Sequence, residues 1–180
     1  MSEMTAEVLE APVIAPTEFY DSVRPELIPS DAHYAALYAD GEFAVKSGTD
    51  IRRFTHRRWI TVTGELHHVG IADYEYPNPA FTVPGRLNNW AAMRDHLYGV
   101  PAIVYSDMTD VSRAVRELKD TSVIWWIATR DRGKLTPEEI CTLLRNEFAA
   151  VLKPADIWAQ QYTDHSGEYD VSQLFGKWYH

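Results

Sequence analysis

The stretch Val69-Gly70-Ile71-Ala72-Asp73-Tyr74-Glu75-Tyr76 joins an apolar run to a pair of acids. The apolar run predicts a buried strand, and side chains alternate between the two faces of a strand, so Asp73 and Glu75 point the same way. Two carboxylates side by side at the end of a buried strand repel each other, which raises the pKa of one of them. A carboxyl with a raised pKa suits a general acid.

Similar short apolar runs recur along the chain with turn signals between them. They predict eight strands, over residues 19–23, 43–46, 59–63, 69–74, 102–105, 123–128, 157–162 and 169–171. Helical patterns cover residues 30–38, 86–98 and 110–119, and Thr136-Pro137-Glu138-Glu139 fits a capping box before a fourth helix. The pattern over 86–98 places Leu87, Trp90, Met93 and Leu97 on one buried face, and the fourth helix is expected to bury Ile140, Leu144, Phe148 and Val151. Of the adjacent Trp125 and Trp126, one is expected to face the barrel interior and the other the helices. Strands that alternate with helices favour a largely parallel sheet.

The fold class is therefore α/β, with a compact and irregular (β/α)₈ TIM-type barrel as the expected architecture. Such barrels usually have about 250 residues, whereas this chain has 180. The shortage falls between residues 47 and 68, where strands follow one another without room for helices, so the barrel is expected to be irregular or partly open there. The alternative is an open doubly wound sheet of five or six strands.

Composition and charge narrow the function classes. Hydrophobic residues make up 46% of the chain, as in soluble globular proteins, and the net charge of −9 argues against duplex nucleic acid as a partner. No apolar run is long enough to span a membrane, and no basic segment followed by an apolar one marks an export signal. Residues 1–17 are interpreted as a flexible N-terminal arm, either without a role or docking onto a larger assembly, and residues 18–180 as one barrel domain.

The predicted strand ends are acidic. Chemistry in a parallel barrel collects where the strands end, so these acids predict a pocket lined by carboxylates. They are Asp21, Glu65, Asp73, Glu75, Asp107, Asp131, Asp164 and Asp170. No metal site or cofactor is predicted, because the His67-His68 pair would face opposite sides of a strand and no phosphate-binding loop is present.

Six motifs in a fixed order resemble the glycoside hydrolase family 25 lysozymes, the muramidases of phages and bacteria that cleave peptidoglycan. They are Phe19-Tyr20-Asp21, Asp73-Tyr74-Glu75, Val104-Tyr105, Trp126-Ile127-Ala128, Trp158-Ala159-Gln160-Gln161-Tyr162 and Tyr169-Asp170-Val171. The resemblance spans about residues 19 to 176 and implies a barrel hydrolase with no cofactor. It also implies a place in a phage virion, or in the host cytoplasm before release.

The resemblance implies a role for each motif. Glu75 would protonate the glycosidic oxygen, Asp73 would stabilise or position the reacting sugar, and Asp21 and Asp170 would complete an acidic floor. The implied sugar-binding residues are Tyr105, Trp126, Trp158, Gln160 and Tyr162. Of the adjacent Gln160 and Gln161, only one can reach the pocket, because neighbouring strand residues face opposite ways.

Two segments depart from the family. The predicted second and third strands, ending Val45-Lys46-Ser47-Gly48 and Ile60-Thr61-Val62-Thr63-Gly64, lack the groups that the family carries there. Two alternatives to an active glycosidase therefore stay open. One is a catalytically inactive lysozyme-like domain that binds glycan or serves a virion or other assembly, and the other is an unrelated small-molecule enzyme on an α/β sheet.

Overall fold

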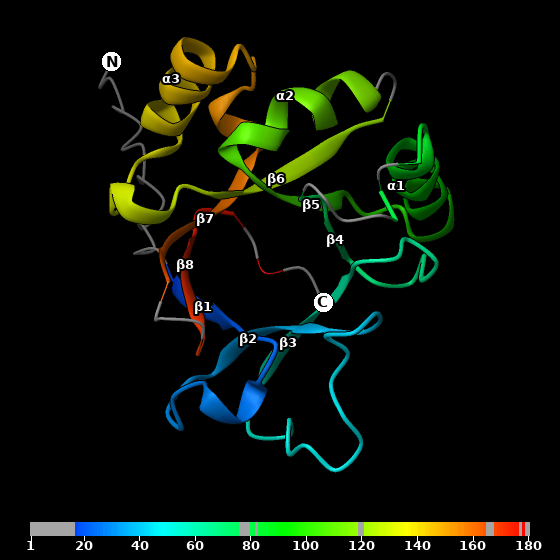
Figure 1. Cartoon of the computed structure of the whole chain (residues 1–180), viewed down its shortest axis with the longest axis vertical. Coiled ribbons are helices and arrows are strands. Elements are labelled where there is room, and N and C mark those ends of the chain that lie inside the picture. Colours follow the sequence, from blue (N-terminus) through cyan, green and yellow to red (C-terminus); the bar gives the residue numbers. More distant parts are fainter. Residues whose placement is uncertain are drawn as a thin grey trace, which may run out of the picture.

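The strands close into an eight-stranded barrel, seen from one end in Figure 1. The computed structural model describes residues 17–75, 80, 81, 83–118, 121–164, 168–176 and 178. In chain order the strands are β1 (Thr17–Asp21), β2 (Tyr34–Tyr38), β3 (His56–Thr61), β4 (Ile71–Asp73), β5 (Ala102–Asp107), β6 (Val123–Ala128), β7 (Ile157–Asp164) and β8 (Asp170–Leu174). The α/β barrel prediction is confirmed and the open sheet is excluded. Residues 1–16, the greater part of the predicted arm, lie outside the described residues, so the arm stays a prediction.

Seven strands run parallel, and β8 runs antiparallel to both of its neighbours, β7 and β1. The carboxyl ends of β1 to β7 therefore share one mouth of the barrel with the first residue of β8. This arrangement places Asp170, at the start of β8, beside residues that end the other strands.

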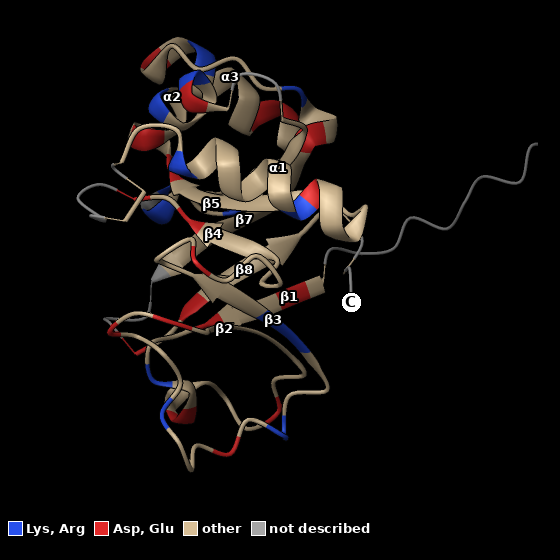
Figure 2. Cartoon of the chain, turned by 90° about the vertical axis from the view of Figure 1, so that its right-hand side faces the viewer, with Lys and Arg blue, Asp and Glu red and all other residues tan. Residues whose placement is uncertain are grey.

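The α-helices of the described chain lie on one side of the barrel. They are α1 (Arg86–Tyr98), α2 (Met108–Glu117) and α3 (Pro137–Phe148), with short 3₁₀ turns η1 (Pro25–Leu27), η2 (Arg130–Arg132) and η3 (Pro154–Asp156) elsewhere. Figure 2 shows the helices as a layer over β4–β7, while irregular segments cover the side of β2 and β3. That bare side is where the sequence predicts no helices, yet the strands there pair continuously and the barrel stays closed.

The second strand differs from its prediction. Residues 34–38 form β2 rather than the end of a helix, and residues 43–46 form no strand. The segment Tyr34-Ala35-Ala36-Leu37-Tyr38 is apolar throughout because one of its faces lines the barrel and the other is covered by the loop that contains Phe54. A short run of Ala and Leu that is buried on both faces carries no period, so helix and strand cannot be told apart from it.

Alternation along the strands separates the barrel interior from the cores outside it, one beneath the helices and one beneath the loop that contains Phe54. Side chains such as Phe19, Ile71 and Trp126 fill the barrel interior. Their neighbours in the chain, such as Ala72 and Trp125, point outward beneath the helices. The predicted split of Trp125 and Trp126 is confirmed.

Helix α1 is rotated relative to its predicted buried face. Leu87 and Trp90 are buried as expected, but Met93 and Leu97 are 42% and 54% exposed. Arg94 takes the inward position instead, where its guanidinium donates to the backbone carbonyls of residues 67–69. Val151, expected beneath the last helix, is likewise exposed.

Candidate active site

Four carboxylates that the sequence singled out meet at one mouth of the barrel. Asp21 and Asp170 are direct partners in the antiparallel pairing of β1 with β8. Asp73 ends β4 two residues after the interior residue Ile71, so it also faces inward, and Glu75 follows two residues later. Each of the other three acids raises the pKa of Asp21 through its charge, so the four act as one electrostatic cluster.

Asp21 is the most deeply buried member of the cluster. Its side chain is only 3% exposed, and burial together with the charges of Asp170, Asp73 and Glu75 raises its pKa well above the usual range. Its Oδ1 atom has no hydrogen-bond partner among the described residues. A buried carboxyl oxygen that the fold leaves unsatisfied is rare, and it marks a place where a ligand or water can bind.

The carboxyl of Asp73 forms a hydrogen bond with the side chain of Tyr38, the last residue of β2. Burial and the neighbouring charge of Glu75 raise the pKa of Asp73 to about 8, and a hydrogen bond from Tyr38 opposes that rise. Asp73 is therefore mostly protonated at neutral pH. It can donate a hydrogen bond to a ligand, which an ionised carboxylate cannot do.

Glu75 combines a raised pKa with access to solvent. Its side chain is 29% exposed, whereas Asp21 and Asp73 are almost fully covered. Burial raises the pKa of Glu75, while the guanidinium of Arg130 and a hydrogen bond with Tyr105 lower it. One Arg130 nitrogen lies 3.5 Å from Glu75 Oε1.

A layer of aromatic side chains supports this mouth from inside the barrel. Tyr105 packs edge-on against Trp126, with ring centroids 4.6 Å apart, and its hydroxyl donates to Gln161. The indole nitrogen of Trp126 donates to Ser172 at 3.0 Å. Both Trp126 and Trp158 are 2% exposed or less. The side chains of these two tryptophans therefore build the floor beneath the acids and do not line an open groove.

Gln160 and Tyr162 lie outside the barrel interior. Gln160 points away from the mouth, where its amide bonds to Thr129 and Gly133, whereas Gln161 points inward to Tyr105. Of the two glutamines, the one that reaches the mouth is Gln161, because beyond the β-bulge in β7 it pairs with the interior residue Ala128 of β6. The hydroxyl of Tyr162 donates to Glu18 at 2.6 Å on the outer surface.

The remaining acidic strand ends have structural roles where the structure describes them. Asp107 caps α2 by accepting from the backbone of Thr109 and Asp110, and Glu65 pairs with Arg86 at 3.5 Å. The side chains of Asp131 and Asp164 lie outside the described residues.

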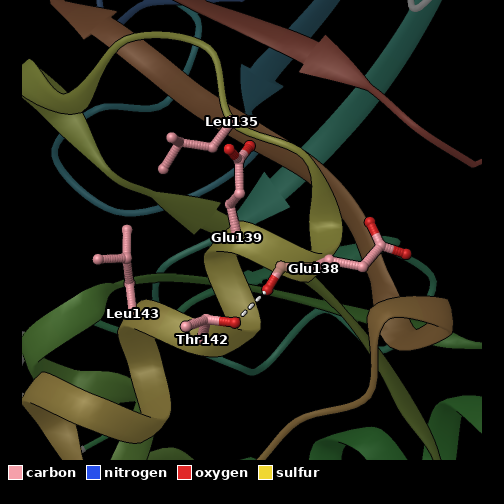
Figure 3. A pocket seen from close by; sticks show the side chains of 5 residues that line it. All are labelled: Leu135, Glu138, Glu139, Thr142 and Leu143. Carbon is pink, nitrogen blue, oxygen red and sulfur yellow. Dashed lines mark hydrogen bonds between the residues drawn. The ribbon is translucent and has the colours of Figure 1, made fainter.

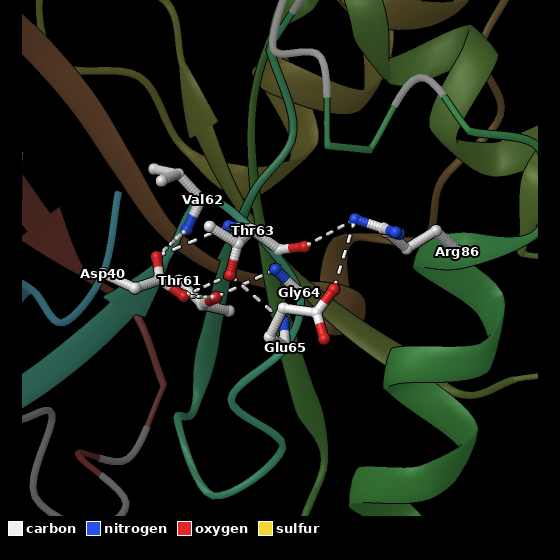
Figure 4. A network of polar contacts seen from close by, with 7 residues as sticks. All are labelled: Asp40, Thr61, Val62, Thr63, Gly64, Glu65 and Arg86. Atoms are coloured by element: carbon white, nitrogen blue, oxygen red, sulfur yellow. Dashed lines mark hydrogen bonds and ion pairs between the residues drawn. The ribbon is translucent and has the colours of Figure 1, made fainter. Parts of the chain in front are cut away.

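Asp40, which the sequence did not single out, fastens the loop after β2 to the end of β3. Its carboxylate accepts from the hydroxyl of Thr63 at 2.6 Å, from the hydroxyl of Thr61 and from the backbone of Val62 at 2.7 Å (Figure 4). Because Tyr38 ends β2 just before Asp40, this network also fixes the rim from which Tyr38 reaches Asp73.

A separate hollow lies on the outer side of α3 (Figure 3). It has a volume of about 360 Å³, and its lining residues are Leu135, Glu138, Glu139, Thr142 and Leu143. Two of its polar side chains are already used within the helix, because Glu139 closes the capping box with Thr136 and Thr142 donates to the backbone carbonyl of Glu138. None of the four clustered carboxylates contributes to it.

Sequence reasoning did not single out Tyr38 or Arg130, and it named Gln160 rather than Gln161 among the implied sugar-binding residues. Tyr38 was not recognised because residues 34–38 were predicted as the end of a helix rather than as β2. Arg130 lies in the turn after β6, and no sequence pattern there indicates which residue it contacts. Gln161 was recognised as one of two candidates, and the strand register decides between them.

A comparison of the chain with known protein families, curated proteins and solved structures finds no match. Within the described residues, no three His, Cys, Asp or Glu side chains form a group that could hold a metal ion. The helices that the structure describes include none long and apolar enough to cross a membrane.

Proposed function

We propose that the chain is a glycoside hydrolase of the muramidase type that cleaves the glycan strands of peptidoglycan by general acid catalysis. The observation that carries the proposal is that Glu75, which is 29% exposed and has a raised pKa, lies with the buried acids Asp21 and Asp73 at one barrel mouth. Hydrolysis of a glycosidic bond needs a protonated carboxyl beside the leaving oxygen and further carboxyl groups around an oxocarbenium-like centre.

The geometry suits Glu75 for the proton transfer. Its carboxyl stays protonated to higher pH than an ordinary Glu because burial disfavours the charged form. Asp73, protonated at neutral pH, would donate a hydrogen bond to a sugar hydroxyl or carbonyl. Asp170 and Asp21, paired across β1 and β8, would form the floor beneath the sugar.

The test is the release of new reducing ends from purified peptidoglycan by the wild type and two variants. Glu75→Gln keeps the shape of the side chain but cannot donate a carboxyl proton, so activity should fall by about 10²–10⁴-fold. Glu65→Gln is the matched control, because Glu65 is 70% exposed and its carboxylate forms an ion pair with Arg86 rather than with Arg130. Cleavage at the wild-type rate by Glu75→Gln would assign the acid to another residue.

A second candidate is a non-catalytic domain that binds glycan or serves an assembly. Two observations favour it. The tryptophans expected to stack on sugar are buried in the barrel, and Asp21 and Asp73 both have raised pKa values, which removes negative charge from the place where a cationic transition state would form. Binding of peptidoglycan fragments by the wild type without release of reducing ends would establish this candidate.

A further inference from the structure

The turn after β6 carries an arginine in a conformation that arginine rarely adopts. Arg130 has a φ of 46°, in the left-handed region that favours glycine. Residues held in this region are strained, and they persist only where the surrounding structure holds them. The segments on both sides of Arg130 therefore need to be fixed.

Two buried glutamines fix those segments. Gln160 donates to Thr129 and to the carbonyl of Gly133 at 2.7 Å, and its Oε1 accepts from the backbone of Leu135 at 2.9 Å. Gln173 donates to the carbonyl of Leu135 at 2.8 Å. The turn is thus bonded to β7 and β8 before and after Arg130, and the strain stays in place.

The strained turn aims Arg130 at the Glu75 carboxyl. The two side chains form an ion pair at 3.5 Å, in which Arg130 is 60% exposed and Glu75 is 29% exposed. An ion pair between two fully exposed side chains has little effect. Here the carboxyl is largely withdrawn from water, so the guanidinium acts on it through a less polar medium.

Other charged and titratable groups face Glu75 from several elements. Asp107 at the end of β5 and Asp110 in α2 disfavour its ionisation, while Tyr105 and Arg130 favour it. Asp21, Asp73 and Tyr38 lie across the mouth and respond to the charge of Glu75 in turn. Asp170, on β8, belongs to the same electrostatic cluster. Arg130 contributes a positive charge that opposes the acids around Glu75.

We propose that Arg130 is a positioning residue, which holds the Glu75 carboxyl toward the open side of the mouth and sets the pH range over which Glu75 keeps its proton. The catalytic role that this inference gives to Arg130 rests on the proposed function, whereas the effect of Arg130 on the ionisation of Glu75 can be measured independently of it. Loss of the guanidinium should raise the pH at which Glu75 ionises. If Glu75 is the general acid, the alkaline limb of the pH–rate profile moves to higher pH with it.

The decisive measurement is the titration of Glu75 by NMR of ¹³C-labelled glutamate carboxyl groups, with Glu75→Gln assigning the resonance. Arg130→Gln removes the charge but keeps a long side chain, whereas Arg130→Lys keeps the charge. Arg130→Gly removes both the charge and the backbone strain, so it tests the charge in a protein that folds at least as readily. Arg132→Gln is the matched control, since Arg132 pairs with Glu147, at 2.7 Å, and not with Glu75.

The expected result is a higher titration midpoint for Glu75 in Arg130→Gln and Arg130→Gly, a midpoint near wild type in Arg130→Lys, and no change in Arg132→Gln. An unchanged midpoint in both charge-removing variants would overturn the inference. A higher KM without movement of the pH profile would also overturn it, because Arg130 would then act by binding substrate. Absence of cleavage by the wild type would contradict the proposed function, while the titration midpoints of Glu75 would still decide the role of Arg130.

Discussion

Replacing Asp73 with Asn should make the protein more stable near neutral pH and leave that gain absent at low pH. The pKa of Asp73 is about 8 in the folded protein, against an ordinary value of 3.8. Because the folded value lies above the unfolded one, the folded protein holds a proton that the unfolded chain releases as pH rises between these values. Stability is therefore lost progressively from about pH 4 to about pH 8.

The size of the effect follows from this window. Each pH unit within it lowers the free energy of unfolding by about 1.4 kcal/mol. From about pH 4 to pH 7 this loss accumulates over about three pH units. At pH 7 an ionisable Asp73 therefore lowers the free energy of unfolding by about 4 kcal/mol relative to a neutral side chain of the same shape. This value is an upper bound, because any opening of the mouth that admits water would relieve the cost.

The assay is thermal unfolding of the wild type and Asp73→Asn at pH 4 and pH 7, followed by circular dichroism. The amide brings its own hydrogen-bonding cost, which is the same at both pH values, so the prediction concerns the change in the difference between the two proteins. For a chain of this size, 4 kcal/mol corresponds to a shift in Tm of about 10 °C.

The exposed Asp95, on the surface of α1, provides the control Asp95→Asn. A Tm difference between wild type and Asp73→Asn that is the same at both pH values would refute the reasoning. It would mean that Asp73 titrates alike in the folded and unfolded states.

Two further variants test the supports of the mouth. Asp40→Ala removes an acceptor shared by two hydroxyls and the backbone of Val62. It should lower the free energy of unfolding, measured in urea titrations, by about 3 kcal/mol. Asp50→Ala, at an exposed carboxylate, is the control, and an effect of Asp40→Ala no larger than that of the control would show that the network does not hold the rim. Trp126→Phe should lower stability by about 1–3 kcal/mol, because it leaves a cavity and removes the donor to Ser172. It should leave glycan binding unchanged, and a large rise in KM with full stability would show that Trp126 touches substrate after all.

Patterns with a clear period or cap were predictable from the sequence. Val123–Ala128 was expected and found as β6, and the Thr136 capping box opens α3 with both of its reciprocal hydrogen bonds. Asp21, Asp73 and Glu75 were expected at or near strand ends, and Asp21 and Asp73 end β1 and β4 while Glu75 follows β4 by two residues. The catalytic roles of these residues stay predictions.

The failures have physical causes. The apolar run of β2 has no period, so its strand could not be distinguished from a helix, and Tyr38 was lost with it. The inward turn of Arg94 in α1 depends on three backbone carbonyls from a distant loop, and no local pattern encodes such partners. The place of Trp158 depends on the β-bulge in the pairing of β6 with β7, which alternation alone does not predict.

Because Asp21 pairs with Asp170, the assembly of the acidic cluster depends on how far the synthesis of the chain has proceeded. Asp21 comes from the first strand of the barrel and Asp170 from the last, and the β1–β8 ladder that brings them together joins segments about as distant in sequence as the barrel contains. Strand pairs of such high contact order form late and slowly, because the chain loses conformational entropy on closing the long loop before the new contacts stabilise it. A nascent chain that lacks β8 has neither a closed barrel nor a complete acidic mouth, so any activity of this site must wait until synthesis has passed residue 174 and the barrel has closed.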